Sequence, residues 1–229
     1  QPSQLKILSK QEVNTLLTHQ CFISQHLIFR MALQTGMRKA ELLSFPSEYI
    51  EDPINKRGRA IVSVVLDSRD MIVQNGRVTD GGTKGKRERT IHIPIGLYER
   101  LWHYKKHDRS ELLQNSDEED SSALFLNRFG KPYSLTGSML NNELKNITER
   151  KDISLHKLRH TYATHTLYAL RKNQNYHGDA LVYVQDRLGH SSIATTQIYL
   201  HYLEDLEGEL MTGFNEEIDQ ISMEGDSNA

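Results

Sequence analysis

Residues 59–93 limit the folds open to this chain, because this segment alone has the composition of β-strands. It contains two runs rich in β-branched residues, AIVSVVL at 60–66 and RTIHI at 89–93. Between them, Asn75-Gly76 and Asp80-Gly81 are dipeptides typical of tight turns. The segment therefore predicts a small antiparallel sheet of two or three strands, with residues 79–86 at or near a turn.

Most of the remaining chain has the patterns of capped helices. Ser9 followed by Glu12 matches a capping box and predicts a helix over about 10–20. Gly36 is a natural stop for a helix over 24–35. Further helices are predicted at 38–43, at 97–107, from a cap at Thr136 to about 150, from a cap at Ser154, at 180–188, and from Ser191 or Ser192 to Tyr199. Residues 108–122 are polar and are predicted to form a loop, and residues 123–126 a short extended piece. The predicted fold class is α+β, mostly α-helical with a small antiparallel sheet.

Charge is distributed unevenly along the chain. Residues 204–229 contain nine Asp and Glu residues and no Lys or Arg, so the net charge of −2 becomes +7 for residues 1–203. A basic body permits binding to a phosphate backbone. A solvated charged surface is an equally good interpretation of the composition alone.

Composition also excludes several classes of protein. The sequence has no run of 18 apolar residues and no apolar signal-peptide core, and its single cysteine, Cys21, excludes an internal disulfide framework and a cysteine-built zinc site. We therefore expect a reducing, cytoplasmic location and no membrane partner. Because the sequence does not begin with Met, we expect a fragment of a longer protein.

Six side chains stand in four recognisable settings. The settings are TGMRKAEL (35–42), TKGKRERTIHIP (83–94), HKLRH (156–160) and LGHSSIATTQIY (188–199). The six residues are Arg38, Lys84, His156, Arg159, His190 and Tyr199. This set suits a phosphodiester under attack by a phenol, because an arginine fork makes two parallel hydrogen bonds to a phosphate and stays charged. A phenol has a pKa of about 10, so it needs neighbouring cations to attack at neutral pH.

In this order and spacing the motifs resemble those of the tyrosine recombinases, the family of phage integrases and site-specific DNA recombinases. The resemblance extends over about residues 8–202. It implies that Arg38 and Arg159 clamp the scissile phosphate, that Lys84 protonates the departing 5′ oxygen, and that Tyr199 is the nucleophile. It also implies that His190 hydrogen-bonds the phosphate. An imidazole at His156 could accept the phenol proton or bind the phosphate.

The resemblance further implies the reaction and the partners. Two successive transesterifications through a 3′-phosphotyrosyl link would cut and rejoin DNA strands without a nucleotide cofactor or a metal. The implied partners are double-stranded DNA, a homotetramer on that DNA, and accessory DNA-bending proteins. The implied location is the bacterial nucleoid, and the implied context is DNA integration or a mobile element. Family members usually carry an N-terminal DNA-clamping domain, which we expect to be missing here.

Two domains of the chain follow from these patterns. Residues 1–203 would be the catalytic domain, and residues 204–229 an acidic tail. Apolar residues at spacings of three and four predict an amphipathic helix in the tail. These residues are Leu203, Leu206, Leu210, Phe214, Ile218 and Ile221. The resemblance implies that this stripe docks on a neighbouring protomer. Packing against its own domain is an equally good alternative.

Several assignments stay open at this stage. Glu41, one helical turn after Arg38, either orients that guanidinium in a supporting role or forms a solvated pair. Lys86 is the alternative to Lys84, and Tyr202 is the alternative to Tyr199. Weaker predictions place Lys86, Arg87 and Arg89 on the DNA backbone.

The other histidines are expected to be structural or solvent-facing. His156 and His160 have a metal-ligand spacing, but Lys157 stands where a zinc protease needs Glu. The residues with this expectation are His160, His165, His103 and His107.

Three rival functions share parts of the pattern. A catalytically silent DNA-binding module would keep the basic body without needing six reactive side chains. A type IB topoisomerase or a telomere resolvase would use the same chemistry. A metal-dependent nuclease would lose cleavage with EDTA, whereas the reaction implied here would not.

Overall fold

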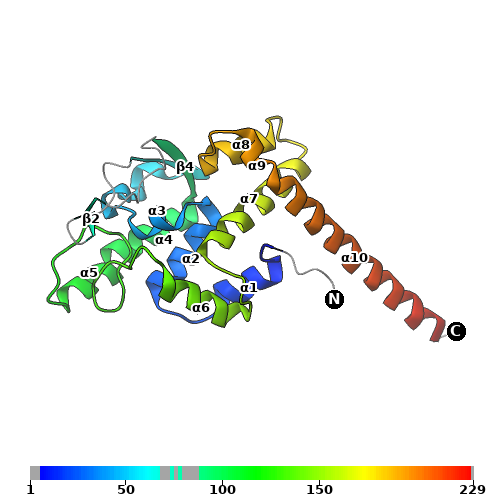
Figure 1. The fold of residues 1–229 in the computed structure, drawn as a ribbon, viewed down its shortest axis with the longest axis horizontal. Coiled ribbons are helices and arrows are strands. Elements are labelled where there is room, and N and C mark those ends of the chain that lie inside the picture. The colour runs from blue at the N-terminus through cyan, green and yellow to red at the C-terminus, as the bar shows by residue number, and fades with distance from the viewer. Residues whose placement is uncertain (1–5, 68–72, 75–76, 79–87, 228–229) are drawn as a thin grey trace.

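Helices form most of the molecule, and one long helix at the C-terminus extends away from the rest (Figure 1). The computed structural model describes residues 6–67, 73–74, 77–78 and 88–227. The α-helices are α1 (Lys10–Thr18), α2 (Ile23–Thr35), α3 (Lys39–Leu43), α4 (Ile95–Lys106), α5 (Asp108–Gln114), α6 (Ser138–Thr148), α7 (Leu155–Lys172), α8 (Ala180–Leu188), α9 (Ile193–Thr196) and α10 (Ile198–Ser227). Two short 3-10 helices, η1 (Ser47–Tyr49) and η2 (Pro53–Lys56), precede the sheet.

The predicted antiparallel sheet is confirmed. Strand β1 (Ile61–Leu66) pairs with β4 (Arg89–Pro94), and Val64 lies opposite Ile91. Burial alternates along β1, so one face packs on the core while the other faces solvent. A separate two-stranded pair joins β2 (Val73–Gln74) to β3 (Arg77–Val78). The predicted turn at 79–86 lies outside the described residues.

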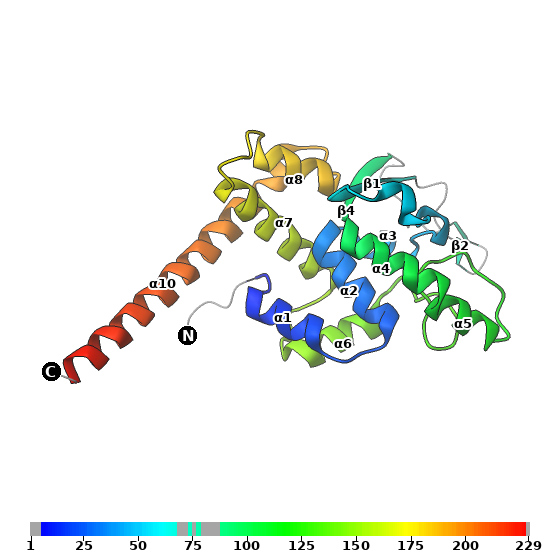
Figure 2. The same cartoon turned by 180° about the vertical axis from the view of Figure 1, so that it is seen from behind.

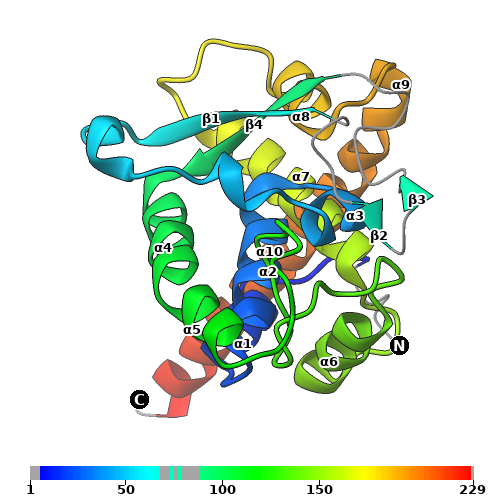
Figure 3. The same ribbon diagram turned by 90° about the vertical axis from the view of Figure 1, so that its left-hand side faces the viewer.

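Helices α2 and α7 pack against each other at the centre of the molecule, and Figure 3 shows α4, α5, α6 and the sheet arranged around them. The main core contains the apolar side chains of α2 together with those of β1, β4, α4 and α6. A second cluster joins α7, α8 and α10 through Tyr162, Leu167, Leu188, Tyr199 and Leu203. This second cluster fixes the first turn of α10, and with it Tyr199, against α7.

Local signals in the sequence set several helix ends as predicted. The capping box is present, because the Ser9 hydroxyl accepts from the Glu12 N–H (3.2 Å) and the Glu12 carboxylate accepts from the Ser9 N–H (2.8 Å). Gly36 ends α2 with a φ of +67°. A Cβ built at Gly36 would lie 2.2 Å from the Tyr162 ring, so glycine also permits α2 and α7 to approach closely.

Three local predictions are wrong. Residues 108–114 form helix α5 instead of a loop; its Arg109 is buried and donates to the Ala123 carbonyl and the Asp120 carboxylate. These tertiary contacts stabilise a helix that its polar sequence does not predict. Thr136 is not the cap of α6, whose N-cap is Gly137. Tyr199 is not in the helix that Ser192 caps, because that helix ends at Thr196 and Tyr199 lies in the first turn of α10.

Helix α10 is packed on the body only at its beginning (Figures 1 and 2). Leu203 and Leu206 are buried, and Leu206 contacts Ile7. Beyond them, the apolar side chains of the same helix are exposed: Leu210, Met211, Phe214, Ile218, Ile221 and Met223. In the part of the chain that the structure describes, we find no helix of the length and apolarity that a bilayer span requires.

Candidate active site

Two guanidinium groups meet where α8 ends. Arg159, on the first turns of α7, donates to the carbonyls of Gly36 and Leu188, each at 2.7 Å. Arg38, just before α3, donates to the next carbonyl, that of Gly189, at 3.4 Å. Carbonyls at helix ends lack intrahelical donors, so Arg159 satisfies the ends of both α2 and α8. The two arginines predicted to share one phosphate therefore lie side by side.

The backbone at Gly189 requires a glycine beside Arg89 and Arg38. Its φ is +68°, and a Cβ at this position would lie 2.6 Å from the Arg89 side chain and 3.8 Å from a nitrogen of Arg38. A side chain here would therefore be strained and would displace the side chain of Arg89.

Arg159 is almost completely buried, with 3% of its surface exposed. Burial, with Arg38 and Arg89 nearby, lowers its pKa to about 10. It therefore remains charged at neutral pH. Positive charge concentrated around one buried arginine favours the binding of an anion at this site.

Glu41 is the buried carboxylate that holds the other two arginines in place. Its side chain is 0% exposed, and it accepts from the Arg38 backbone N–H (2.8 Å) and the Arg38 guanidinium (3.1 Å). The fork of Arg89 donates to both of its oxygens, at 2.5 and 2.8 Å. Glu41 therefore contacts Arg38 as predicted, and the alternative of a solvated pair is wrong.

Arg89 is not placed as the sequence predicted. Only 7% of its side chain is exposed, and its Nε donates to the Arg187 carbonyl at 3.3 Å in addition to the Glu41 contacts. Burial is the main cause that lowers its pKa, while Glu41 acts in the opposite direction. A side chain held in this way does not fit the predicted contact with the DNA backbone. It supports Glu41 and, through it, Arg38.

His190 lies between α8 and α9 beside Arg159. Its Nε2 is 3.3 Å from an Arg159 nitrogen, and its Nδ1 is 2.9 Å from the Thr196 hydroxyl. Since arginine only donates, the network assigns Nε2 as the acceptor and places the ring proton on Nδ1. Burial, then Arg159, Arg38 and Arg89, lowers the pKa of His190 to about 4, so the ring is neutral at neutral pH. Sequence reasoning missed the contact with Thr196.

Tyr199 is buried at the start of α10, with 1% of its surface exposed. Its ring is parallel to that of His190, with centroids 6.3 Å apart. Burial raises the pKa of Tyr199 to about 12, although the charges of Arg159 and Arg38 act to lower it. The phenol therefore keeps its proton in this state. Tyr202, the predicted alternative, packs with its ring 6.0 Å from that of Tyr199.

The side chain that contacts the Tyr199 hydroxyl is His160 and not His156. The His160 Nδ1 lies 2.9 Å from the Tyr199 oxygen. His156 is more exposed, and its ring centroid lies 4.4 Å from that of His160. The sequence prediction of a structural or solvent-facing role missed the contact of His160. The sequence signal for the contact of His160 with Tyr199 is the spacing of four residues between His156 and His160, a spacing that also suits metal ligands.

Three predicted basic residues, Lys84, Lys86 and Arg87, lie outside the described residues. The contacts of His165 fit its predicted structural role, because its Nε2 lies 2.8 Å from the Leu8 carbonyl. Among the residues that the structure describes, no cluster of three or more His, Cys, Asp or Glu side chains could hold a metal ion.

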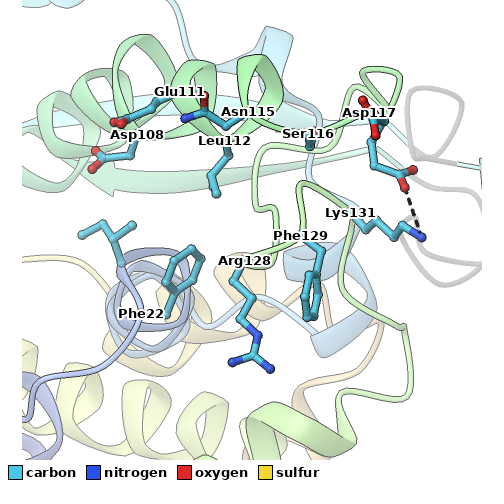
Figure 4. Close-up of a pocket in the computed structure, with 12 residues that line it drawn as sticks. Phe22, Asp108, Glu111, Leu112, Asn115, Ser116, Asp117, Arg128, Phe129 and Lys131 are labelled. Atoms are coloured by element: carbon cyan, nitrogen blue, oxygen red, sulfur yellow. Dashed lines mark ion pairs between the residues drawn. The ribbon is translucent and has the colours of Figure 1, made fainter.

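A pocket of about 660 Å³ lies elsewhere on the molecule (Figure 4). Its walls come from α5, from the start of α2 and from the loops at 115–118 and 128–131. Phe22, Phe129 and several carboxylates, including Asp108 and Glu111, line it. None of the candidate catalytic residues belongs to this pocket, so the arrangement of Arg38, Arg159, His190 and Tyr199 identifies the site better than cavity size does.

Comparisons with known proteins identify the family of the chain. Residues 6–205 match the family model described as the phage integrase family. The chain is 36% identical over 164 residues to tyrosine recombinase XerD of Halalkalibacterium halodurans, covering 66% of this chain and 51% of that protein. It is 32% identical over 162 residues to tyrosine recombinase XerC of Lacticaseibacillus casei, covering 65% of this chain and 51% of that protein. The chain thus spans about half the length of the curated relatives it matches.

Solved structures show the same fold. XerA recombinase matches with a TM-score of 0.60 and 22% identity, covering 91% of this chain and 64% of that one. XerH site-specific recombinase bound to its difH substrate matches with a TM-score of 0.59 and 20% identity, covering 85% of this chain and 50% of that one. The chain belongs to the phage integrase family, the tyrosine recombinases.

Proposed function

We propose that this chain is the catalytic part of a site-specific DNA recombinase that cuts and rejoins strands through a 3′-phosphotyrosyl intermediate. The observation that carries the proposal is the meeting of Arg38, Arg159, His190 and Tyr199 from four separate segments. Family membership supports it, as do relatives whose structures contain DNA, such as the Tn1549 transposon integrase in complex with transposon right-end DNA.

The proposed reaction uses charge stabilisation. Arg38 and Arg159 would hold the non-bridging oxygens of the scissile phosphate. His190, whose Nε2 contacts Arg159, would lie beside that phosphate. Tyr199 would attack phosphorus while Lys84 protonates the departing 5′ oxygen. A 5′ hydroxyl of a partner strand would then attack the phosphotyrosyl bond and release Tyr199. The bond energy is conserved, so the cycle consumes no nucleotide.

The structure corresponds to a resting arrangement in this scheme. Both Arg159 contacts at 2.7 Å go to backbone carbonyls, and the Tyr199 hydroxyl is buried. Arg38 is the more accessible arginine, with 27% of its side chain exposed. Arg38 would therefore meet the phosphate first. A shift of the first turn of α10 would then bring the Tyr199 hydroxyl into line with phosphorus.

The outer part of α10 supports a second element of the proposal, assembly on DNA. Its exposed apolar side chains, from Leu210 to Ile221, lie beyond Leu206, the last buried apolar residue of the helix. Exposed apolar side chains along one helix are typical of a protein interface. We assign this segment to contact with a second copy of the chain in a tetramer on double-stranded DNA.

A trapping experiment on randomised DNA tests the function whatever site the protein prefers. The protein is incubated with a library of randomised duplexes that carry a nick, so that the short fragment diffuses away after cleavage and the phosphotyrosyl link persists. Covalent adducts are recovered on a denaturing gel and sequenced. We expect adducts with the native chain, in EDTA as well as without it, and none with Tyr199→Phe.

The rival functions predict other results. A silent DNA-binding module would bind duplexes and yield no adduct with either protein. Loss of cleavage in EDTA would indicate a metal-dependent nuclease. A topoisomerase would form adducts and relax supercoiled plasmids without exchanging strands between two duplexes.

A further inference from the structure

We propose that His160 accepts the proton of the Tyr199 hydroxyl during strand cleavage and returns it during rejoining. This inference rests on the proposed function. The observation behind it is the contact of 2.9 Å between His160 Nδ1 and the Tyr199 oxygen. That distance is within the range needed for direct proton transfer.

The two rings are held for this contact by their positions in the fold. His160 lies on α7 next to Arg159, and Tyr199 lies in the first turn of α10, which packs on α7. Their ring centroids are 5.5 Å apart, and the Tyr202 ring lies 5.8 Å from His160 on another side. The contact therefore joins the two helices at the candidate nucleophile.

The direction of the hydrogen bond follows from the protonation states. Burial raises the pKa of Tyr199 to about 12, and burial with neighbouring charges lowers that of His160 to about 4. Both groups are therefore neutral at neutral pH, and the phenol is the stronger acid. The network assigns the phenol as donor to a free lone pair on Nδ1, with the ring proton on Nε2.

Several charged or titratable groups act on His160. His156, Lys157 and Arg159 share its helix, His190 approaches from the turn after α8, and Tyr199 and Tyr202 approach from α10. Burial, and after it the neighbouring charges, lowers the pKa of His160 and makes the resting ring a poor base. A bound phosphodiester would add negative charge beside Arg159 and so raise the basicity of His160 when the substrate is present. The acidity of the phenol also rises as its oxygen begins to bond to phosphorus.

The step balances as follows in the cleavage direction. The Tyr199 oxygen forms a bond to phosphorus, and its proton moves to His160 Nδ1. The bond between phosphorus and the 5′ oxygen breaks, and that oxygen takes a proton from the general acid, proposed to be Lys84. In rejoining, a 5′ hydroxyl gives its proton to the now neutral general acid, proposed to be Lys84, as its oxygen bonds to phosphorus. The bond between phosphorus and the Tyr199 oxygen breaks, and His160 returns its proton to the departing phenolate.

The test uses a nicked duplex recovered by the trapping experiment and compares cleavage rates of His160→Asn and the native chain. Asparagine keeps a hydrogen-bonding group near the position of Nδ1 but accepts no proton near neutral pH. We expect the rate at pH 7 to fall by about 100-fold or more, within the usual contribution of a general base. We expect the loss to shrink as pH rises towards 10, because the phenolate fraction of Tyr199 rises about tenfold for each pH unit below its pKa of about 12.

His165→Gln is the matched control. His165 lies on the same helix, is partly buried, and contacts a backbone carbonyl through Nε2, which a glutamine amide can replace. We expect native cleavage rates from it. Thermal unfolding of each variant verifies the fold, and His160→Gln provides a second variant if His160→Asn does not fold.

A second substrate separates the two proton transfers. A duplex with sulfur in place of the bridging 5′ oxygen has a leaving group that departs without a proton. The defect of His160→Asn should persist on this duplex, because the attacking phenol is unchanged. A defect that disappears would assign His160 to the leaving group and overturn the proposal.

The remaining outcomes also test whether His160 accepts the proton of Tyr199. A native rate for His160→Asn, or a reduced rate with no recovery at high pH, would exclude proton acceptance by His160. The same pH signature from His156→Asn in place of His160→Asn would move the role to His156. If the native chain forms no adduct at all, the proposed function fails; if it does and His160→Asn matches it, only this inference fails.

Discussion

Arg38 and Arg159 have the same predicted role, yet the fold treats them differently. Arg159 is 3% exposed and joins the ends of α2 and α8 through two carbonyls. Arg38 has 27% of its side chain exposed and is held by Glu41, which also binds the buried Arg89. One arginine is thus part of the framework of the site, while the other faces its open side. Replacing these two arginines should therefore change the free energy of unfolding by different amounts, although both are predicted to bind the phosphate.

Glu41→Ala should have the largest effect on folding. It leaves the buried guanidinium of Arg89 without its carboxylate, and losing one partner of a buried ion pair costs about 3–5 kcal/mol. Urea unfolding at pH 7 measures this loss, with Glu99→Ala, an exposed carboxylate on α4, as the control. A loss below about 1 kcal/mol would mean that Arg89 finds another partner.

Arg159→Ala should come next. It leaves the carbonyls of Gly36 and Leu188 buried without this donor, at about 1–3 kcal/mol for each unsatisfied group. Arg159→Lys should recover only part of the loss, because one ammonium group cannot reproduce the planar fork. Equal stabilities for Arg159→Lys and the native chain in urea would contradict the framework role.

Arg38→Ala should separate activity from stability. We expect about 1 kcal/mol or less of lost stability, because the ion pair is partly exposed, but a loss of about 100-fold or more in adduct formation. Unfolding and trapping assays on the same preparation test this. If Arg38→Ala destabilised the chain as much as Arg159→Ala, the contrast between the two arginines would be wrong.

Acid should weaken the same site. The pKa values of His160 and His190 are lowered from 6.5 to about 4 in the folded state, so the unfolded chain binds their protons first as pH falls. The contribution of these two histidines to the free energy of unfolding is fully present above pH 6.5. It is lost progressively as pH falls from about 6.5 to 4. Unfolding curves at pH 7, 6 and 5 should show a shallower decline for His190→Asn than for the native chain. Parallel declines would refute this contribution.

Removing residues 210–229 should have the smallest effect on folding. The apolar side chains lost are exposed, so stability should change by no more than about 0.5 kcal/mol. Assembly on trapped DNA, measured by sedimentation, should be lost. Intact assembly after truncation would exclude α10 as the contact between copies, and unfolding would show that the segment packs on its own body.

The sequence predicted most of the scaffold from short-range signals. The capping box at Ser9, the stop at Gly36, the cap at Ser154 and the β-branched runs all form the predicted elements. The order of the motifs also predicted that Arg38 and Arg159 approach one another. It did not predict helix α5, whose buried Arg109 depends on a partner eleven residues away.

Helix caps, turns and strand alternation depend on dihedral angles and hydrogen bonds within a few residues, so they follow from local sequence. Packing between distant segments selects which polar side chains are buried and what they contact: Arg89 contacts Glu41, and His160 contacts Tyr199. Such contacts join segments 39 to 48 residues apart. They form once packing has removed water, so that each buried polar group must find its partners within the protein.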